Sequence, residues 1–221
     1  MQKLREVYPD AHCELDFETP FQLLVATILS AQCTDKRVNV VTRDLFQKYR
    51  NAYALAESDQ TELEQAIKST GFYRNKAKSL RAMAKDLVEK YRGEVPQTMA
   101  ELTLLAGVGR KTANVVLNTA FGEETFAVDT HVFRVCNRTG LAPGKTPEEV
   151  EAKLEKIVPQ PFRRDAHHWL ILHGRYTCKA RLPECWRCPV IDLCRYKPKT
   201  PPPEERVKAK SSAARTGRRS P

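Results

Sequence analysis

The sequence contains no apolar run long enough to cross a bilayer, and its first residues, MQKLREVYPDAHCELDF, lack the apolar stretch of a secretory signal. No segment sustains the period-two alternation of apolar and polar residues that is typical of strands. The seven cysteines are an odd number, so complete disulfide pairing is impossible and a metal or redox role is favoured. We therefore expect a soluble intracellular protein rich in helix.

The positive charge of the chain is unevenly distributed. The net charge is +10, and nine Lys/Arg against two Asp/Glu place +7 of it between Arg195 and Pro221. The argument for a polyanionic partner therefore depends largely on the C-terminal segment. Residues 198–221 have almost no apolar side chain to bury, and we expect a basic, disordered tail. It is either an inert solvated extension or an arm with nonspecific affinity for a polyanion.

Apolar residues at helical spacing, bounded by capping patterns, run through most of the chain. The candidate caps are Thr19–Pro20, Asp35, Thr61/Glu64, Thr98/Glu101, Thr146/Glu149 and Asp165. Short turns separate the predicted helices. The sequence therefore predicts an all-α fold of many short helices.

A glycine pair interrupts the helical pattern within residues 105–130, LAGVGRKTANVVLNTAFGEETFAVDT. Gly107 and Gly109, on either side of Val108, allow positive φ and leave no side chain between the backbone and an approaching group. The helix that follows begins with unpaired N–H groups at the positive end of its dipole, which is a phosphate site that needs no basic side chain. For a glycine pair alone, an ordinary turn between two helices remains the alternative.

The longer string LxGVGRKTAxxV is far more specific, and it resembles the helix–hairpin–helix of the base-excision DNA glycosylases. The resemblance continues through VLNTAFGEETFAVDTHVFRVCNRT. Within this superfamily the sequence is most similar to the endonuclease III family, from about Leu15 to Tyr196. Ala106 stands where the family commonly has proline, and Cys33 where it commonly has a small residue such as alanine. The loop that follows keeps Gly122 but lacks the family's proline.

A lysine and an aspartate supply the chemistry that this resemblance implies. Lys111 directly follows the hairpin, where the positive helix end disfavours an ammonium and so favours the neutral amine of a nucleophile. By resemblance, Lys111 attacks C1′ of the damaged nucleotide, the base leaves, an imine forms, and elimination cuts the strand. Asp129 is placed to cap the next helix and, by resemblance, to assist the reaction. The alternatives are a phosphate-neutralising lysine and a plain helix cap.

Attack on C1′ requires the nucleotide to leave the duplex, and other side chains must then fill the gap. By resemblance, Gln32 is the gap-filling glutamine and Phe72 is an apolar wedge. Each also suits a structural role, Gln32 as a polar helix end and Phe72 as a core residue. We expect Ser30, Asp35 and His131 to line or support the pocket.

Four of the seven cysteines lie close together in the spacing C-x6-C-x2-C-x5-C: Cys178, Cys185, Cys188 and Cys194. A four-cysteine zinc site usually has two C-x2-C knuckles, and only one is present here. The spacing therefore favours a [4Fe–4S] cluster and leaves zinc as the alternative. The same spacing occurs in the cluster loop of the endonuclease III family, where the cluster is expected to order the loop. Lys179 and Arg181 are expected to contact DNA phosphates.

The resemblance implies two helical domains with damaged double-stranded DNA in the cleft between them. Residues 13–123 form a six-helix domain with the hairpin, and residues 1–12 with 124–197 form the domain with Asp129 and the cluster. We expect a monomer that has no membrane partner and lies in the cytoplasm, associated with the nucleoid in a bacterium. The implied activity is removal of oxidised pyrimidines by a DNA glycosylase that is also an abasic-site lyase. Relatives that act on adenine or thymine mismatches generally lack a lysine at position 111, and a non-catalytic hairpin module would bind DNA without strand scission.

Overall fold

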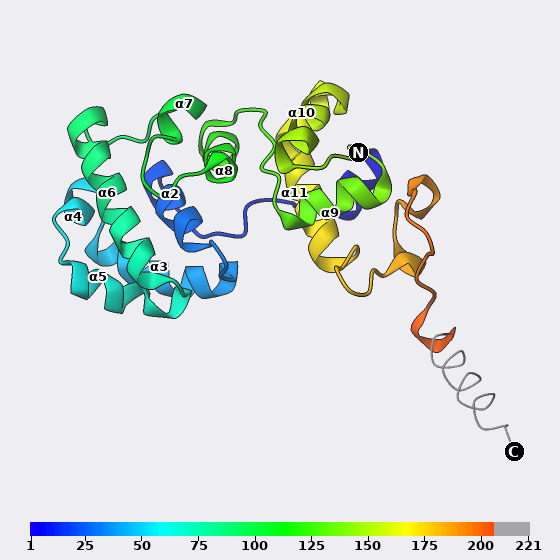
Figure 1. Ribbon diagram of the computed structural model, residues 1–221, viewed down its shortest axis with the longest axis horizontal. Helices are drawn as coiled ribbons and strands as arrows, with labels where there is room; N and C mark the ends of the chain where they lie inside the picture. Colours follow the sequence, from blue (N-terminus) through cyan, green and yellow to red (C-terminus); the bar gives the residue numbers. More distant parts are fainter. Residues whose placement is uncertain (206–221) are drawn as a thin grey trace, which may run out of the picture. The chain divides into compact units, whose positions relative to one another are not determined.

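The computed structural model describes residues 1–205, and residues 206–221, which hold most of the predicted basic tail 198–221, lie outside the described residues. The described residues form helices and turns without a strand, so the predicted all-α fold is confirmed (Figure 1). Contacts divide the chain into two units. We call His12–Ala127 the hairpin unit, and Met1–Ala11 with the described residues from Val128 onward the cysteine unit.

The hairpin unit is built around one helix that is buried on every side. Its elements are α2 (Pro20–Leu29), α3 (Asp35–Lys48), α4 (Ala52–Ala56), α5 (Gln60–Ile67), the 3-10 turn η1 (Lys68–Thr70), α6 (Tyr73–Tyr91), α7 (Met99–Leu102) and α8 (Arg110–Phe121). Helix α2 reads PFQLLVATIL, and every residue after its first is buried. A helix that is apolar all round must lie inside the core. Helices α3, α6 and α8 pack against it.

The cysteine unit contains the remaining helices. They are α1 (Gln2–Val7), α9 (Thr130–Thr139), α10 (Pro147–Ile157), α11 (Gln160–Tyr176) and the 3-10 turns η2 (Cys185–Arg187) and η3 (Ile191–Leu193). Helix α11 packs against α9 and α1. The crossing with α9 is close, because a Cβ on Gly174 would lie 2.7 Å from the Cβ of His131. No helix among residues 1–205 is long and apolar enough to cross a membrane.

Side-chain caps define most helix starts, although three predicted caps are wrong. Thr19, Thr98, Thr146 and Asp129 accept hydrogen bonds from first-turn N–H groups, as expected. Thr34 caps α3 in place of Asp35, and Asp59 caps α5 in place of Thr61. In both cases a residue slightly earlier in the chain has a side-chain oxygen that accepts the first-turn N–H hydrogen bond. Helix α11 begins at Gln160 after Pro159, so Asp165 lies inside it.

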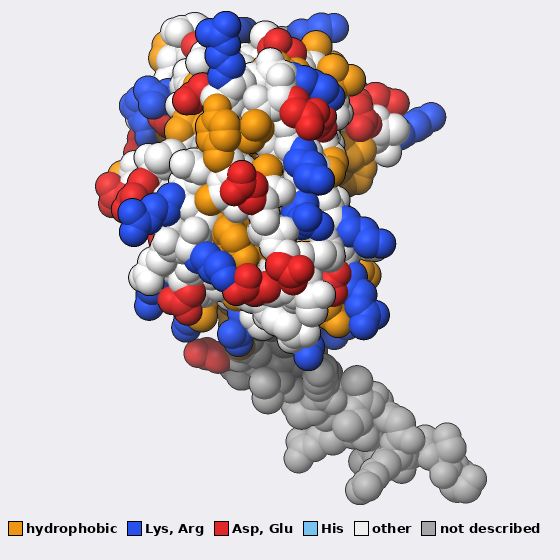
Figure 2. Space-filling model, turned by 90° about the vertical axis from the view of Figure 1, so that its left-hand side faces the viewer, with side chains coloured by type: hydrophobic (Ala, Val, Ile, Leu, Met, Phe, Trp, Pro, Cys, Tyr) orange, Lys and Arg blue, Asp and Glu red, His pale blue; other side chains and the backbone are white. Residues whose placement is uncertain are grey.

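Charged side chains of both signs are interspersed on the face shown in Figure 2. No single-sign patch dominates that face. This distribution agrees with the sequence, in which most of the net charge lies beyond residue 194. Recognition of a polyanion by the folded part therefore depends on local geometry more than on bulk charge.

The two hairpin glycines should respond differently to alanine. Gly107 has φ +79°, and a Cβ there would lie 2.9 Å from the Cβ of Ser79. We expect Gly107→Ala to lower the free energy of unfolding by roughly 1–3 kcal/mol, measured by urea denaturation. Gly109 has φ −90°, and a Cβ added there would meet nothing within 4 Å, so Gly109→Ala should stay within about 0.5 kcal/mol of the wild type. Equal stability of the two variants would contradict this account.

Candidate functional site

The hairpin turn is held against the body of its unit by its own backbone and by two apolar side chains. Leu105 and Val108 are buried, and the N–H of Val108 donates to the carbonyl of Leu105 at 3.1 Å. Gly107 fits closely over Ser79 of α6 and Ile28 of α2. The three predicted hairpin residues thus divide their roles: Gly107 and Val108 seat the turn, and Gly109 remains exposed at the start of α8.

The start of α8 is open to a ligand. Gly109 is the N-cap residue and supplies no side chain, and within the described residues the first turn has no side-chain cap hydrogen bond. Lys111 is the second residue of α8, and its side chain is exposed. The described residues give its amine neither a hydrogen bond nor an ion pair. The structure therefore places a free amine beside uncovered backbone donors at the positive end of a helix.

Three exposed residues of the hairpin unit, Gln32, Phe72 and Arg92, adopt a backbone conformation that is rare outside glycine. Gln32, between α2 and α3, has φ 54°, and Phe72, between η1 and α6, has φ 49°. Phe72 is 64% exposed, so the core position considered from the sequence is wrong. Such a conformation costs about 1–3 kcal/mol per residue and persists only where the surroundings impose it. Arg92 ends α6, where a left-handed residue is common, so strain and exposure leave Gln32 and Phe72 as the functional candidates.

The predicted pocket residues Ser30 and Asp35 flank Gln32 in the same loop. The Ser30 hydroxyl donates to the carbonyl of Thr27 at 2.8 Å and ends α2. Asp35 is the first residue of α3, just after its Thr34 cap. The structure thus places three predicted residues on one short segment.

Asp129 lies in the cysteine unit, where it caps α9. Its Oδ1 accepts hydrogen bonds from the N–H groups of His131 and Val132, both at 2.8 Å. No partner for Oδ2 is found among the described residues, and the side chain is half-buried. His131, the third pocket candidate, lies in the first turn of α9, with its Nδ1 3.2 Å from an Arg134 guanidinium nitrogen. The cap therefore fixes one carboxylate oxygen and leaves the other available.

Two buried asparagines on α8 have a structural role that was not predicted from the sequence. The Asn114 amide donates to the carbonyl of Phe126 at 3.2 Å, and the Asn118 amide donates to the carbonyls of Glu123 and Thr125 at 3.0 and 3.3 Å. They hold the segment that leaves α8 against that helix. Polar residues four apart in the apolar run ANVVLN were the available signal.

Two arginines on α9, whose role was not predicted from the sequence, hold the start of residues 178–194, the cysteine loop. The Arg134 guanidinium donates to the carbonyls of Gly174 at 2.8 Å and Cys178 at 3.0 Å. The Arg138 guanidinium donates to the carbonyls of Lys179 and Ala180, each at 2.7 Å. Burial lowers the pKa of Arg134, and the electrostatic interaction with Cys178 offsets part of that effect. Their spacing of four residues puts both side chains on one face of α9.

The four cysteines predicted as ligands line one small cavity: Cys178, Cys185, Cys188 and Cys194. None of them forms a disulfide. Burial raises the pKa of the Cys188 thiol, the other three cysteines raise it further, and a backbone contact at Val190 lowers it. Within residues 1–205, no three His, Cys, Asp or Glu side chains surround a position for a single metal ion.

The two basic residues of the cysteine loop differ in whether their side chains are paired. The Lys179 amine donates to a Glu184 carboxylate oxygen at 2.7 Å, and this bond lowers the pKa of Glu184, as does Arg187. Arg181 is exposed. Of these two residues, only Lys179 is engaged in an ion pair within the described residues.

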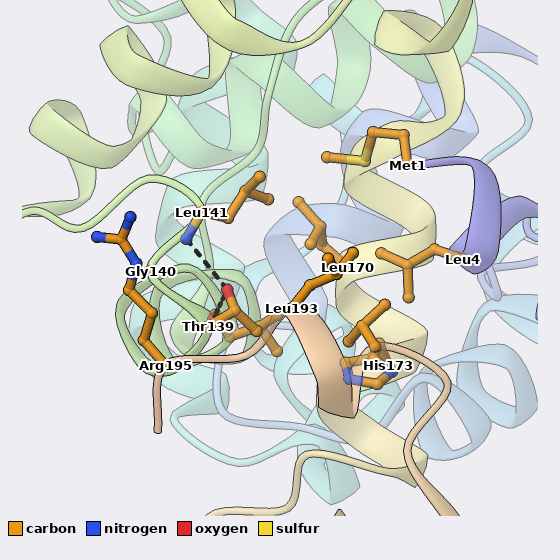
Figure 3. Close-up of a pocket in the computed structure, with 11 residues that line it drawn as sticks. Met1, Leu4, Thr139, Gly140, Leu141, Leu170, His173, Leu193 and Arg195 are labelled. Atoms are coloured by element: carbon orange, nitrogen blue, oxygen red, sulfur yellow. Dashed lines mark hydrogen bonds between the residues drawn. The ribbon is translucent and has the colours of Figure 1, made fainter. Parts of the chain in front are cut away.

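A second cavity, of about 190 Å³, adjoins the cysteine loop (Figure 3). It is lined mainly by apolar side chains from α1, α9, α11 and η3, among them Leu4, Leu170 and Leu193. His173 lines both this cavity and the one between the cysteines. Burial lowers its pKa to about 4, so His173 is neutral beside the thiols.

Comparison with known proteins identifies the family. Residues 25–160 match the HhH-GPD superfamily base excision DNA repair protein family. Endonuclease III of Haemophilus influenzae is 53% identical over 199 residues, which cover 90% of this chain and 94% of the relative. A non-covalent endonuclease III–DNA complex matches with a TM-score of 0.85 and 47% identity over 94% of each chain. A trapped endonuclease III–DNA covalent intermediate matches with a TM-score of 0.84 and 49% identity over 88% of this chain and 92% of that one. The chain therefore belongs to the endonuclease III family of the HhH-GPD superfamily, whose members are base excision DNA repair proteins.

Proposed function

We propose that this DNA glycosylase and abasic-site lyase acts as a monomer on damaged double-stranded DNA, from which it removes oxidised pyrimidines such as thymine glycol. One observation carries the proposal: the exposed, unpaired amine of Lys111 in the open first turn of α8. The relative that was trapped as a covalent intermediate with DNA supports a nucleophile of this kind.

The hairpin binds the DNA backbone. A phosphate that approaches exposed Gly109 meets uncovered N–H groups and the positive end of the α8 dipole, and no side chain keeps it away. Such contacts fix register and carry no sequence information. They suit an enzyme that must bind any sequence and select a damaged base.

Gln32 and Phe72 fill the space that a flipped nucleotide leaves. Unstacking and unpairing a base costs a few kcal/mol, least for a damaged base. The exposed Phe72 ring can stack in the duplex, and the Gln32 amide can hydrogen-bond to an unpaired base. Ser30 and Asp35 flank Gln32, and with His131 they are assigned to the support of the pocket.

The reaction uses the Lys111 amine as nucleophile and the Asp129 carboxylate as its assistant. The amine attacks C1′, the glycosidic bond breaks, and its electron pair leaves with the base, which takes up a proton. Ring opening gives the imine, and loss of a C2′ proton expels the 3′ phosphate by β-elimination. The free Oδ2 of Asp129 stabilises the positive charge that develops at the sugar or accepts a proton.

Four free thiols that line one cavity support a [4Fe–4S] cluster, and Glu184, which also lines that cavity, is paired with Lys179 and Arg187. Cys178, Cys185, Cys188 and Cys194 would hold the cluster, and when bound it would order the loop that carries Lys179 and Arg181. Arg134 and Arg138 fix the carbonyls beside the first ligand and place positive charge near the thiolates.

Substitution of Lys111 tests the nucleophile. We expect wild-type protein with a thymine-glycol duplex and sodium borohydride to give a covalent adduct, and Lys111→Gln to give none, because an amide cannot form an imine. The measurement is the shifted band on a denaturing gel. Lys85→Gln, an exposed lysine on α6, is the control and should trap normally. An adduct that persists in Lys111→Gln rejects the assignment, and a wild type that binds the duplex without trapping is a non-catalytic module.

Two substitutions of Asp129 separate capping from chemistry. Asp129→Asn keeps an oxygen for the N–H groups of His131 and Val132, so its unfolding free energy should stay within about 0.5 kcal/mol of the wild type, whereas Asp129→Ala should lose about 1 kcal/mol. Both should slow base release by about 10²–10⁴-fold, because neither carries the charge. Single-turnover rates and urea denaturation measure the two effects. A wild-type rate in Asp129→Asn would reduce Asp129 to a cap.

Metal analysis of the purified protein tests the cluster. We expect about four iron and four sulfide per chain, with visible absorption that disappears in Cys185→Ser. About one zinc per chain and no iron would instead establish the zinc alternative.

A further inference from the structure

One lysine of α6 is buried, unlike the other lysines of that helix. Lys76 lies one turn after Phe72 and is 6% exposed. Its ammonium donates to the carbonyl of Leu29 and to the carbonyl of Thr70, both at 2.8 Å. No carboxylate within the described part of the chain pairs with it. Backbone carbonyls are therefore its principal partners.

These two carbonyls stand directly before the loops that contain Gln32 and Phe72. Leu29 is the last residue of α2 and precedes the loop with Gln32. Thr70 is the last residue of η1 and precedes Phe72 by two positions. Carbonyls at helix ends lack intrahelical partners and carry partial negative charge, which an ammonium satisfies. A single group thus joins two chain segments that are 47 and 6 residues from it in sequence.

Burying the Lys76 ammonium costs more free energy than burying an apolar side chain of similar length, because the charge must be desolvated. Burial lowers the pKa of the Lys76 ammonium, and the nearby Cys33 thiol in the Gln32 loop raises it. Left-handed conformations at Gln32 and Phe72 require surroundings that impose them. The contacts of Lys76 hold the residues that lead into both loops.

We propose that Lys76 is a positioning residue that locks the two loops to each other, so that Gln32 and Phe72 enter the duplex as one rigid unit. The proposal rests on the gap-filling role assigned above to these two residues. Lys76 itself lies beneath the loops and does not reach DNA. Its effect is on the geometry of insertion and not on the chemistry at Lys111.

Fluorescence of 2-aminopurine tests the proposal independently of catalysis. The probe is placed opposite a tetrahydrofuran abasic analogue in a duplex, which cannot form an imine, and the protein is added to saturation. Wild type and Lys111→Gln should give the full rise in fluorescence, because insertion unstacks the probe base. Lys76→Met should saturate at less than about half of that amplitude, near the level of Gln32→Ala/Phe72→Ala. The matched control is Lys85→Met, an exposed lysine of the same helix, which should give the full rise.

A double-mutant cycle on a thymine-glycol duplex gives the second readout. Lys76→Met should lower kcat/KM by about 10-fold or more in the wild-type background and by less than about 2-fold when Gln32 and Phe72 are already alanine. If Lys76→Met does not fold, Lys76→Gln, which keeps one amide donor, takes its place in both experiments.

Three results bear against the inference, and each is distinct. Full fluorescence amplitude in a folded Lys76 variant overturns the positioning role, as do losses that multiply in the cycle. Full amplitude in Gln32→Ala/Phe72→Ala overturns the gap-filling role on which the inference rests. In that last case the trapping experiment on Lys111 still stands.

Discussion

The close seating of the hairpin turn on α2 and α6 is the constraint on which the hairpin unit depends. Helix α2 is buried on every side, so its position is fixed by the core, and Gly107 lets the turn approach Ile28 of α2 and Ser79 of α6 without a side chain between them. That contact sets where α8 begins and therefore where Lys111 stands. The same end of α2 leads into the Gln32 loop, so one buried helix positions both the hairpin and a loop assigned to DNA insertion.

The molecule separates groups that hold the structure from groups that remain free to react. Buried polar side chains satisfy carbonyls: Lys76 at two helix ends, and Asn114 and Asn118 along the segment after α8. Exposed groups such as Lys111 lack partners among the described residues. Asp129 combines both functions, because one oxygen caps α9 while the other stays open. An active site requires donors and nucleophiles that are held rigidly in place and are not already bonded to other protein groups.

The sequence was sufficient to predict the helical fold, several helix caps and the family, because periodicity, capping chemistry and the hairpin string are local. It failed for Asp35, Thr61 and Asp165, where a competing cap or a proline stood nearby, and for exposed Phe72, where hydrophobicity alone suggested a core alternative. The roles of Lys76, Arg134 and Arg138 could not be predicted. Their partners are backbone carbonyls as much as 47 residues away, and carbonyls carry no sequence signal.

The central claim is that one particular amine, at the open end of α8, forms the bond to DNA. Peptide mapping by mass spectrometry of the wild-type protein, after borohydride trapping on a thymine-glycol duplex and nuclease digestion, tests it most directly. The account predicts that the deoxyribose remnant is attached to Nζ of Lys111. A remnant on the N-terminal amine, or on any other lysine of the chain, would contradict it.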